Sequence, residues 1–405
     1  MPSGHPDQFQ VPPAQHEAGC PDWTEAPPCI CPAPPLSFPA FNPLPGAFIV
    51  SNQAEPIASS LAGHGSGRLT AVHIDAYNAE LRDEAGFIGD RASGRAFRAI
   101  LDDVRERVSQ VDDDPVGDMP SREISKKKMD RLLVDGDPDA AGILIGTIEE
   151  FAQEFAIVIG RFLRLDDWRG TQRIIVGGGL RASRIGELAI GRTSVILKGA
   201  GHEVQLAPIR HDPDEAGLIG CIHLIPSWAF SGHDAILAVD IGGSNIRVGI
   251  VELNLRKAPD LSRSTVCASE LWRHADDRPD REGAVARLAD MLRALIKRAD
   301  KQGLQLAPFI GVGCPGLIRE DGSIEKGGQN LPGDWEHRGF NLPQLLHEAI
   351  PAIGGHETVV LMHNDAVVQG LSEVPFMRDV ERWGVMTIGT GLGNARFTNR
   401  ASSGE

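Results

Sequence analysis

The chain of 405 residues lacks several features that define whole classes of proteins. None of its apolar runs approaches the ~18 residues that a transmembrane helix requires, so we expect no membrane association. The first residues, MPSGHPDQFQVPPAQ, contain neither a basic segment nor an apolar core, so no secretory signal is expected. Six scattered cysteines do not form a disulfide framework. These absences predict a cytoplasmic location.

The chain also has fewer basic than acidic residues. The chain has 40 Lys and Arg against 55 Asp and Glu, a formal net charge of −15. A nucleic-acid phosphate backbone demands clustered Lys and Arg, so we expect no nucleic-acid partner. The one basic run, Lys126–Lys128, is flanked by acidic residues and is interpreted as the solvated face of a helix.

Two well-known nucleotide-binding motifs are missing. No G-x-x-x-x-G-K-[ST] segment occurs, which excludes a P-loop, and protein-kinase signatures are absent. The stretch Gly311–Gly316 has the spacing G-x-G-x-x-G, which is typical of dinucleotide folds when it opens a helix. Here Pro315 and the turn-forming residues that follow open a loop instead, so a dinucleotide fold is not predicted.

The length predicts two or three domains. Residues 1–45 are rich in proline and poor in aliphatic residues, which indicates a poorly ordered arm. Cys29 and Cys31, close to His16, could bind zinc. Because no second close cysteine pair follows, incidental thiols are the preferred interpretation, and zinc stays open.

The most informative stretch is Ala235–Glu252. An apolar run ends in Asp240, a glycine-containing turn follows, and then Ile246, Val248 and Ile250 alternate with other residues. This pattern predicts a β-hairpin. Two adjacent glycines let backbone amides approach an anion, and a carboxylate at the end of a strand can hold a divalent cation. The turn therefore predicts a metal–phosphate site made of Asp240, Gly242, Gly243, Ser244 and Asn245.

A second strand–turn–strand unit ends the chain. Residues 384–388 lead into Gly389-Thr390-Gly391-Leu392-Gly393, and another strand follows. A third glycine-rich turn, Gly177-Gly178-Gly179, follows the strand 173–176. Any one such turn is most simply a tight hairpin, but three of them favour a phosphate-binding protein. Asp365, after the buried strand 358–362, could accept a proton from a substrate hydroxyl; capping the next helix is the alternative role.

Five motifs, which occur in the family's order over about 160 residues, resemble those of the ROK family (repressors, open reading frames and kinases) of sugar kinases. This family belongs to the hexokinase–actin–chaperone ATPase superfamily. Asp240–Arg247 is similar to the family's first phosphate motif, with Ser244 in place of threonine, and Gly389–Gly393 to the second. Gly311–Gly316 and Asn330–Gly333 resemble its sugar-side loops. Asn364-Asp365 resembles the sugar-binding asparagine and the catalytic aspartate.

The order of the segments departs from the family. Members continue for more than a hundred residues past the second phosphate motif, whereas this chain ends at Glu405. Residues 148–224 resemble that missing portion, so we expect a circular permutant in which residues 228–233 join the family's old ends. Residues 46–232 would form the nucleotide-side lobe, and residues 233–405 the phosphate, sugar and catalytic segments. The alternative is an unrelated N-terminal domain beside a truncated kinase, which would leave the last hairpin with unpaired edges.

The resemblance implies an α/β, two-lobed ribonuclease H-like fold and ATP-dependent phosphorylation of a hexose or N-acetylhexosamine. It implies Mg²⁺ near Asp240, phosphates on the two hairpin turns, and adenosine against Gly177, Gly178 and Gly179. The sugar contacts would be Asn330, Asn364, Gly316 and Gly333, with Asp365 as the catalytic base.

The family's Glu-x-Gly-His sugar contact and its zinc cluster have no clean match; Ala62-Gly63-His64 and Gly404-Glu405 are faint candidates for the former. A non-catalytic sugar or nucleotide sensor therefore stays the alternative function. The sugar's identity and a homo-oligomeric state are left open by the sequence.

Overall fold

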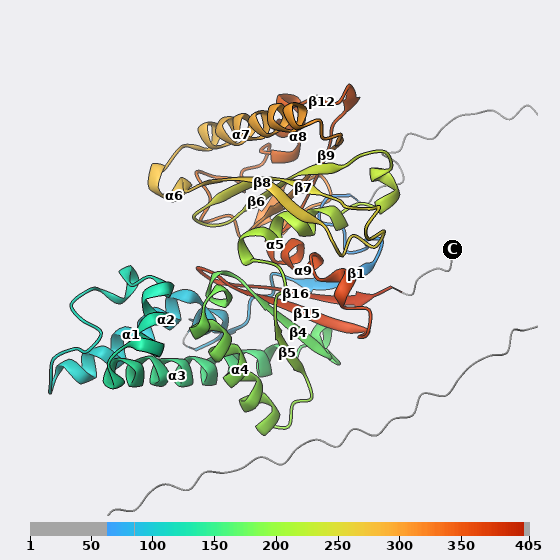
Figure 1. Ribbon diagram of the computed structural model, residues 1–405. Coiled ribbons are helices and arrows are strands. Elements are labelled where there is room, and N and C mark those ends of the chain that lie inside the picture. The colour runs from blue at the N-terminus through green and yellow to red at the C-terminus, as the bar shows by residue number, and fades with distance from the viewer. Residues whose placement is uncertain (1–62, 85, 401–405) are drawn as a thin grey trace, which may run out of the picture. The chain divides into compact units, whose positions relative to one another are not determined.

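A computed structural model describes residues 63–84 and 86–400, which belong to one compact unit (Figure 1). The expected Pro-rich arm, the Cys29–Cys31 pair, Ala62 and Gly404-Glu405 lie outside the described residues. Within the described ranges, no helix combines the length and the apolar character that crossing a bilayer would take. The architecture is built on two five-stranded sheets.

The first sheet has the strand order β14-β9-β6-β7-β8. β6 and β7 form the expected hairpin, in which Asp240 lies opposite Arg247, and β8 extends it antiparallel. β9 and β14 then add in parallel to β6. Its strands are β6 (Ala235–Ile241), β7 (Ile246–Glu252), β8 (Thr265–Trp272), β9 (Leu306–Cys314) and β14 (Val359–Asn364).

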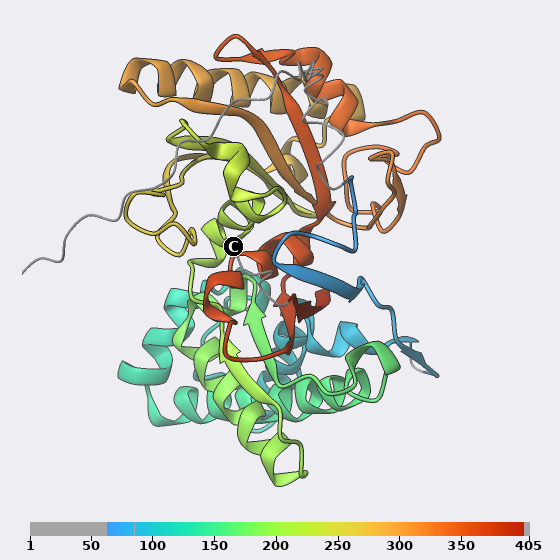
Figure 2. The same cartoon turned by 90° about the vertical axis from the view of Figure 1, so that its right-hand side faces the viewer.

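The second sheet repeats this arrangement with strands from both ends of the chain, in the order β1-β16-β15-β4-β5. The hairpin β15–β16 pairs antiparallel with β1 and parallel with β4. Figure 2 shows the blue segment with β1 beside the red C-terminal strands. Its strands are β1 (Val72–Tyr77), β4 (Arg173–Gly177), β5 (Gln205–Pro208), β15 (Arg382–Ile388) and β16 (Leu392–Asn399).

Both sheets therefore place an antiparallel three-stranded unit beside two parallel strands, in the ribonuclease H-like order. The expected two-lobed fold class is confirmed. Strands from residues 72–77 and 173–177 cover both edges of the last hairpin, which the separate-domain alternative would leave unpaired. The pairing agrees with a permuted order of segments; circular permutation itself stays a prediction.

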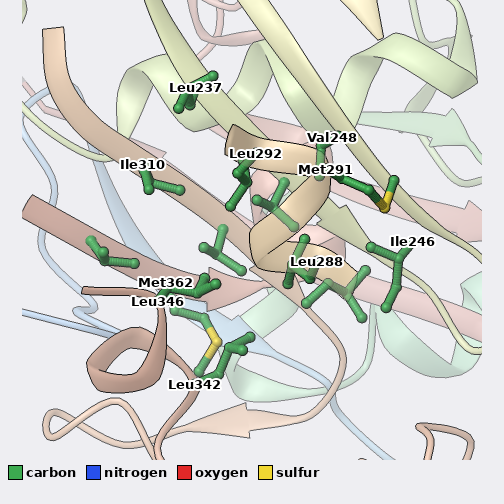
Figure 3. Packing of buried hydrophobic residues seen from close by; sticks show 14 of the residues in the cluster. Leu237, Ile246, Val248, Leu288, Met291, Leu292, Ile310, Leu342, Leu346 and Met362 are labelled. Atoms are coloured by element: carbon green, nitrogen blue, oxygen red, sulfur yellow. The ribbon is translucent and has the colours of Figure 1, made fainter. Parts of the chain in front are cut away.

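Successive side chains of a strand point to opposite faces of its sheet, and they pack into three separate hydrophobic cores. In β6, Leu237 and Val239 face a core shared with helix α7 (Arg281–Gln302), whereas Ile236 and Ala238 face the space between the sheets. Figure 3 shows Leu237 with Leu288, Met291 and Leu292 of α7 in the first core. In β4, Ile175 faces that same central space. Its neighbours Ile174 and Val176 face a third core under the helices of the second lobe. Each sheet is thus covered on both faces.

Helices cover the outer faces of both sheets (Figure 1). The first lobe carries α6 (His274–Asp277), α7 (Arg281–Gln302) and α8 (Leu342–Ala349). The second lobe carries α1 (Gly94–Ser109), α2 (Lys126–Asp135), α3 (Pro138–Phe162) and α4 (Arg184–Gly199). Small two-stranded pairs complete the fold: β2 (Arg82–Asp83) with β3 (Gly86–Phe87), β10 (Leu317–Ile318) with β11 (Ile324–Lys326), and β12 (Ala352–Ile353) with β13 (His356–Glu357).

Two short helices, α5 (Pro213–Gly220) and α9 (Asp365–Leu371), fill the central core between the sheets. They cross at Gly220, where a Cβ atom would come within 1.7 Å of the Val368 carbonyl oxygen. Glycine is therefore required, because no side chain fits between the two backbones. This contact sets the spacing of α5 and α9 in the central core.

The longest helix differs from expectation. Apolar residues at helical spacing, such as Ile148, Phe151 and Phe155, predict a helix over residues 148–165. The helix α3 instead begins ten residues earlier, at Pro138. Asp137 caps its first turn by accepting from the Asp139 amide, and proline suits the first helical position. The early turns escaped prediction because Gly142 and Gly146 weaken their helical propensity.

Candidate functional site

A cleft of about 440 Å³ lies between the two lobes and collects most of the predicted site residues. It is lined by both hairpin turns, the start of α5, the loops that contain Gly316 and Asn330, and the start of α9. The predicted residues in its lining are Gly178, Gly179, Asp240, Gly242, Gly243, Ser244, Asn245, Gly316, Asn330, Asp365, Gly389, Thr390, Gly391 and Gly393. Segments separated by more than 200 residues thus meet at one cleft.

The turn between β6 and β7 is held from two sides. The Gly242 amide donates to the Asn245 carbonyl at 2.8 Å, which closes the turn. The buried His274 ring donates from Nε2 to the Gly242 carbonyl at 2.9 Å. These bonds fix the turn before any ligand arrives.

The turn between β15 and β16 is held by the start of α1. The Gly94 amide donates to the Gly389 carbonyl at 2.9 Å, and Arg95 Nε donates to the Thr390 carbonyl at 2.9 Å. Gly178 approaches the base of the same turn, since a Cβ there would lie 2.4 Å from the Ile388 carbonyl oxygen, and its φ of +84° is left-handed. A glycine is therefore needed where the triple-glycine turn contacts β15.

Asp240 is the next-to-last residue of β6, and its side chain is 13% exposed. Burial raises the pKa of its carboxyl to about 6, although the guanidinium of Arg247, with Nη1 3.5 Å from Oδ2, acts in the opposite direction. Arg247 also pairs with Asp214 in the first turn of α5 at 2.8 Å. The sequence pattern missed Arg247 and Asp214, which line the cleft beside Asp240.

Asp365 is the first residue of α9, and its carboxyl faces the same cleft. Burial, and next the nearby negative charge of Asp240, raise its pKa to about 7. A carboxylate with this pKa is a suitable proton acceptor near neutral pH. The alternative role as helix cap falls to its neighbour, since Asn364 is the N-cap of α9.

Asn364 is not among the residues that line the cleft. Its side-chain oxygen accepts from the amides of Ala366 and Val367, and its Nδ2 donates to the Gly316 carbonyl at 3.0 Å. Asn364 is 2% exposed, and these bonds use its amide oxygen and one of its two Nδ2 hydrogens, so its role as a sugar contact stays a prediction. Asn364 also holds Asp365 and Gly316 in position.

Three further predicted or candidate residues lie outside the cleft lining. Gly333 packs against the backbone of Arg281, and Gly177 is the last residue of β4. His64 accepts from the Met362 amide through Nδ1, beside β14. Of the three glycines in the triple-glycine turn, only Gly178 and Gly179 line the cleft.

Three of the buried polar atoms that have no hydrogen-bond partner among the described residues belong to residues of the cleft lining. They are the Nδ2 atom of Asn78, the Oδ1 atom of Asn245 and the Oε1 atom of Gln369. A buried polar atom without a partner costs about 1–3 kcal/mol, so a polar ligand that supplies one is favoured. Asn78 and Gln369 carried no signal in the sequence, because neither belongs to a glycine-rich motif.

A second, smaller cavity of about 190 Å³ adjoins both glycine-rich turns of the second lobe. Phe97, Met129, Leu180 and Ile388 give it apolar walls, and the backbone of Gly179 and Gly389 borders it. Lys126 Nζ donates to the Gly179 carbonyl, which fixes α2 against this turn. The cavity suits an apolar ring whose substituents point toward the phosphate turns.

The donor set near Asp240 fits a magnesium ion. Mg²⁺ prefers oxygen ligands and is held by one or two carboxylates together with substrate phosphates and waters. The Asp240 carboxylate and the unpartnered oxygens of Asn245 and Gln369 supply such ligands in the cleft lining. Within the described ranges, no group of three or more His, Cys, Asp or Glu side chains could hold a metal by itself.

Comparison with known proteins agrees with the motifs. No family model matches the chain. Over 166 residues the chain is 26% identical to a glucokinase of Thermotoga maritima, a match that covers 40% of this chain and 44% of that protein. The chain thus spans less than half the length of this curated relative. The similarity confirms the resemblance to sugar kinases.

Solved structures give partial likenesses. A protein classed as a sugar kinase from Cytophaga hutchinsonii is 19% identical, covers 41% of this chain and 48% of its own, and has a TM-score of 0.32. A ROK hexokinase from Thermus thermophilus is 22% identical, covers 33% of this chain and 35% of its own, and has a TM-score of 0.23. These TM-scores are too low to support an argument about the site, so its chemistry is derived from its own residues.

Proposed function

We propose that the chain is an ATP-dependent sugar kinase that transfers the γ-phosphoryl group to a hydroxyl of a hexose or an N-acetylhexosamine. The observation that carries this proposal is the meeting of two glycine-rich hairpin turns with Asp240 and Asp365 in one cleft. The glucokinase-like segment supports it.

In this proposal the amides of Gly242–Asn245 and Gly389–Gly393 bind the phosphates of ATP. The adenine ring occupies the small cavity lined by Phe97, Met129 and Leu180, against Gly178 and Gly179. Asp240 holds Mg²⁺, directly or through water, and the ion offsets the negative charge of the phosphates.

The sugar binds beside Gly316 and Asn330, with the reacting hydroxyl next to Asp365. The hydroxyl oxygen attacks the γ-phosphorus, the bond from that phosphorus to the β–γ bridging oxygen breaks, and the hydroxyl proton passes to Asp365. ADP carries away the electron pair of the broken bond. Because phosphoryl transfer needs little covalent chemistry from the protein, most of the rate follows from positioning and from charge stabilisation.

The substitution Asp365→Asn tests the proton-accepting role. A general base typically contributes about 10²–10⁴-fold, so we expect kcat to fall on that scale while ATP still binds. Purified protein would be incubated with Mg-ATP and a panel of hexoses and N-acetylhexosamines while ADP release is followed. Asp321→Asn, a change on an exposed loop of the same lobe, is the matched control. Equal turnover in the Asp365→Asn variant would remove this residue from the mechanism.

The placement of Asn364 favours one alternative, a sugar or nucleotide sensor without turnover, because the amide oxygen of this expected sugar contact caps the helix α9. Sugar binding by calorimetry without sugar-dependent ADP release would support the sensor. ADP release that is independent of every sugar would contradict both functions.

A further inference from the structure

Asn78 is placed beside the sugar-side loops by the strand β1 of the other lobe. It follows the last residue of β1 and lines the cleft together with Gly316, Gly327 and Asn330. The preceding Tyr77 donates from its hydroxyl to the Ile318 carbonyl at 3.3 Å. The end of β1 therefore crosses from the second sheet to the loops of the first.

The backbone of Asn78 is held in an unusual conformation. Its φ of +51° is left-handed, which asparagine tolerates better than most residues other than glycine. Its amide donates to the Asn394 carbonyl at 2.9 Å. The Asn394 side chain, which is 3% exposed, bonds to both the amide and the carbonyl of Ala79 at 3.0 Å. Backbone strain that the surrounding bonds maintain is typical of functional sites.

The side chain of Asn78 has an unused donor. Its Nδ2 is buried and has no hydrogen-bond partner among the described residues, although it lies against the backbone of Gly327. Since Asn78 lines the cleft, an oxygen atom of a bound ligand is available as the missing acceptor. The donor lies among the loops assigned to the sugar.

We propose that Asn78 donates a hydrogen bond from Nδ2 to an oxygen of the acceptor sugar and so positions the hydroxyl that Asp365 deprotonates. This inference rests on the proposed kinase function. Asn394 belongs to β16 and follows Gly393 directly, so the residue that holds Asn78 is adjacent to the second glycine-rich motif. Asn78 thus sets the place of the acceptor relative to the phosphate.

The substitution Asn78→Gly removes the amide and keeps a residue that adopts a positive φ without strain. We expect KM for the sugar to rise about tenfold, which corresponds to the loss of one hydrogen bond. KM for ATP and the unfolding temperature should stay unchanged. Asn254→Gly is the matched control, because Asn254 has the same φ of +51°, binds the Arg263 carbonyl and is not among the cleft residues.

A second variant, Asn78→Asp, keeps the size of the side chain and replaces the donor with an oxygen. It should raise KM for the sugar at least as much, and it serves as the test if the glycine variant fails to fold. Sugar KM values within twofold of wild type in both folded variants would overturn the inference alone. A rise in KM for ATP instead would overturn it too, because Asn78 would then act on the nucleotide side.

The proposed function has its own readout in this experiment. If the unsubstituted protein shows neither sugar-dependent ADP release nor calorimetric binding of any sugar in the panel, the kinase proposal fails and this inference falls with it. If the unsubstituted protein is active and binds sugar, the Asn78 variants decide the inference separately.

Discussion

Two carboxyl groups share the cleft, and the negative charge of Asp240 raises the proton affinity of Asp365. Burial raises the pKa of Asp240 to about 6 and that of Asp365 to about 7, and the charge of Asp240 contributes to the higher value. Arg247, next to Asp240, lowers the pKa of that carboxyl alone. As the pH rises, Asp240 therefore loses its proton before Asp365 does, as a cation ligand requires. Asp365 has the higher proton affinity, as a base requires.

This difference predicts the pH dependence of the reaction. A base works only when it is deprotonated, and the raised pKa of Asp365 means that its protonated form predominates below about pH 7. We expect kcat/KM for the sugar to fall by about tenfold per pH unit on the acid side of pH 7 and to level off above it. A profile measured from pH 5 to 9 checks this. An unchanged kcat/KM down to pH 5 would contradict it.

At the scale of single elements, the two hairpins and the strands 173–176 and 358–362 could be predicted, whereas β1 could not. The alternating apolar residues around Asp240 predict β6 and β7, and the same pattern around residues 389–393 predicts β15 and β16; all four strands are present. Alternation is a local property of each strand. The pairing of β1 with β16 joins residues more than 300 positions apart, so no local pattern could reveal it.

The same limit applies to the site. The glycine-rich turns and the two aspartates follow strands with clear patterns, and they line the cleft. Asn78, Arg247 and Gln369 were missed because their place depends on how distant segments pack. For Asn364 the sequence does not show whether its amide bonds to the helix or to the cleft. Its oxygen accepts from two amides of α9, and the sugar contact stays a prediction.

The crossing of α5 and α9 gives a prediction for stability. Gly220→Ala would place a methyl group 1.7 Å from the Val368 carbonyl oxygen, so the two helices would have to move apart. We expect a loss of about 3 kcal/mol or more in the free energy of unfolding, a cost of overpacking in a core. Denaturant unfolding followed by circular dichroism measures it.

A matched substitution in α4 should act in the opposite direction. Gly191 lies in the middle of this helix, is exposed, and has no atom within 4 Å of an added Cβ. Gly191→Ala should therefore stabilise the protein by about 0.5–1 kcal/mol, the usual gain in helical propensity. Equal effects of the two substitutions would show that the crossing is looser than described.

At the scale of the whole molecule, the two sheets have the same strand order although their strands occur differently along the chain. The first sheet is formed by one continuous segment, whereas the second combines residues 72–208 with residues 382–399. β16 ends opposite the start of β1, where the Arg400 amide donates to the Ala71 carbonyl. The second lobe therefore closes only when both parts of the chain are present.

This arrangement predicts that the chain tolerates a different starting point. A variant that begins at His233, continues through Arg400, passes through a flexible linker of about ten residues to Gly63 and ends at Gly232 should fold. We expect its unfolding temperature to lie within about 5 °C of the original. A variant cut inside β6, between Leu237 and Ala238, is the control and should not fold. Failure of the first variant would contradict the proposed equivalence with an unpermuted kinase.

The backbone contact between Gly220 and Val368 has a mechanical consequence for the molecule. No side chains lie between the two backbones there, so the contact cannot rearrange into an alternative packing. The helices α5 and α9 cannot approach more closely at this point, and they can separate there only if this backbone contact is lost.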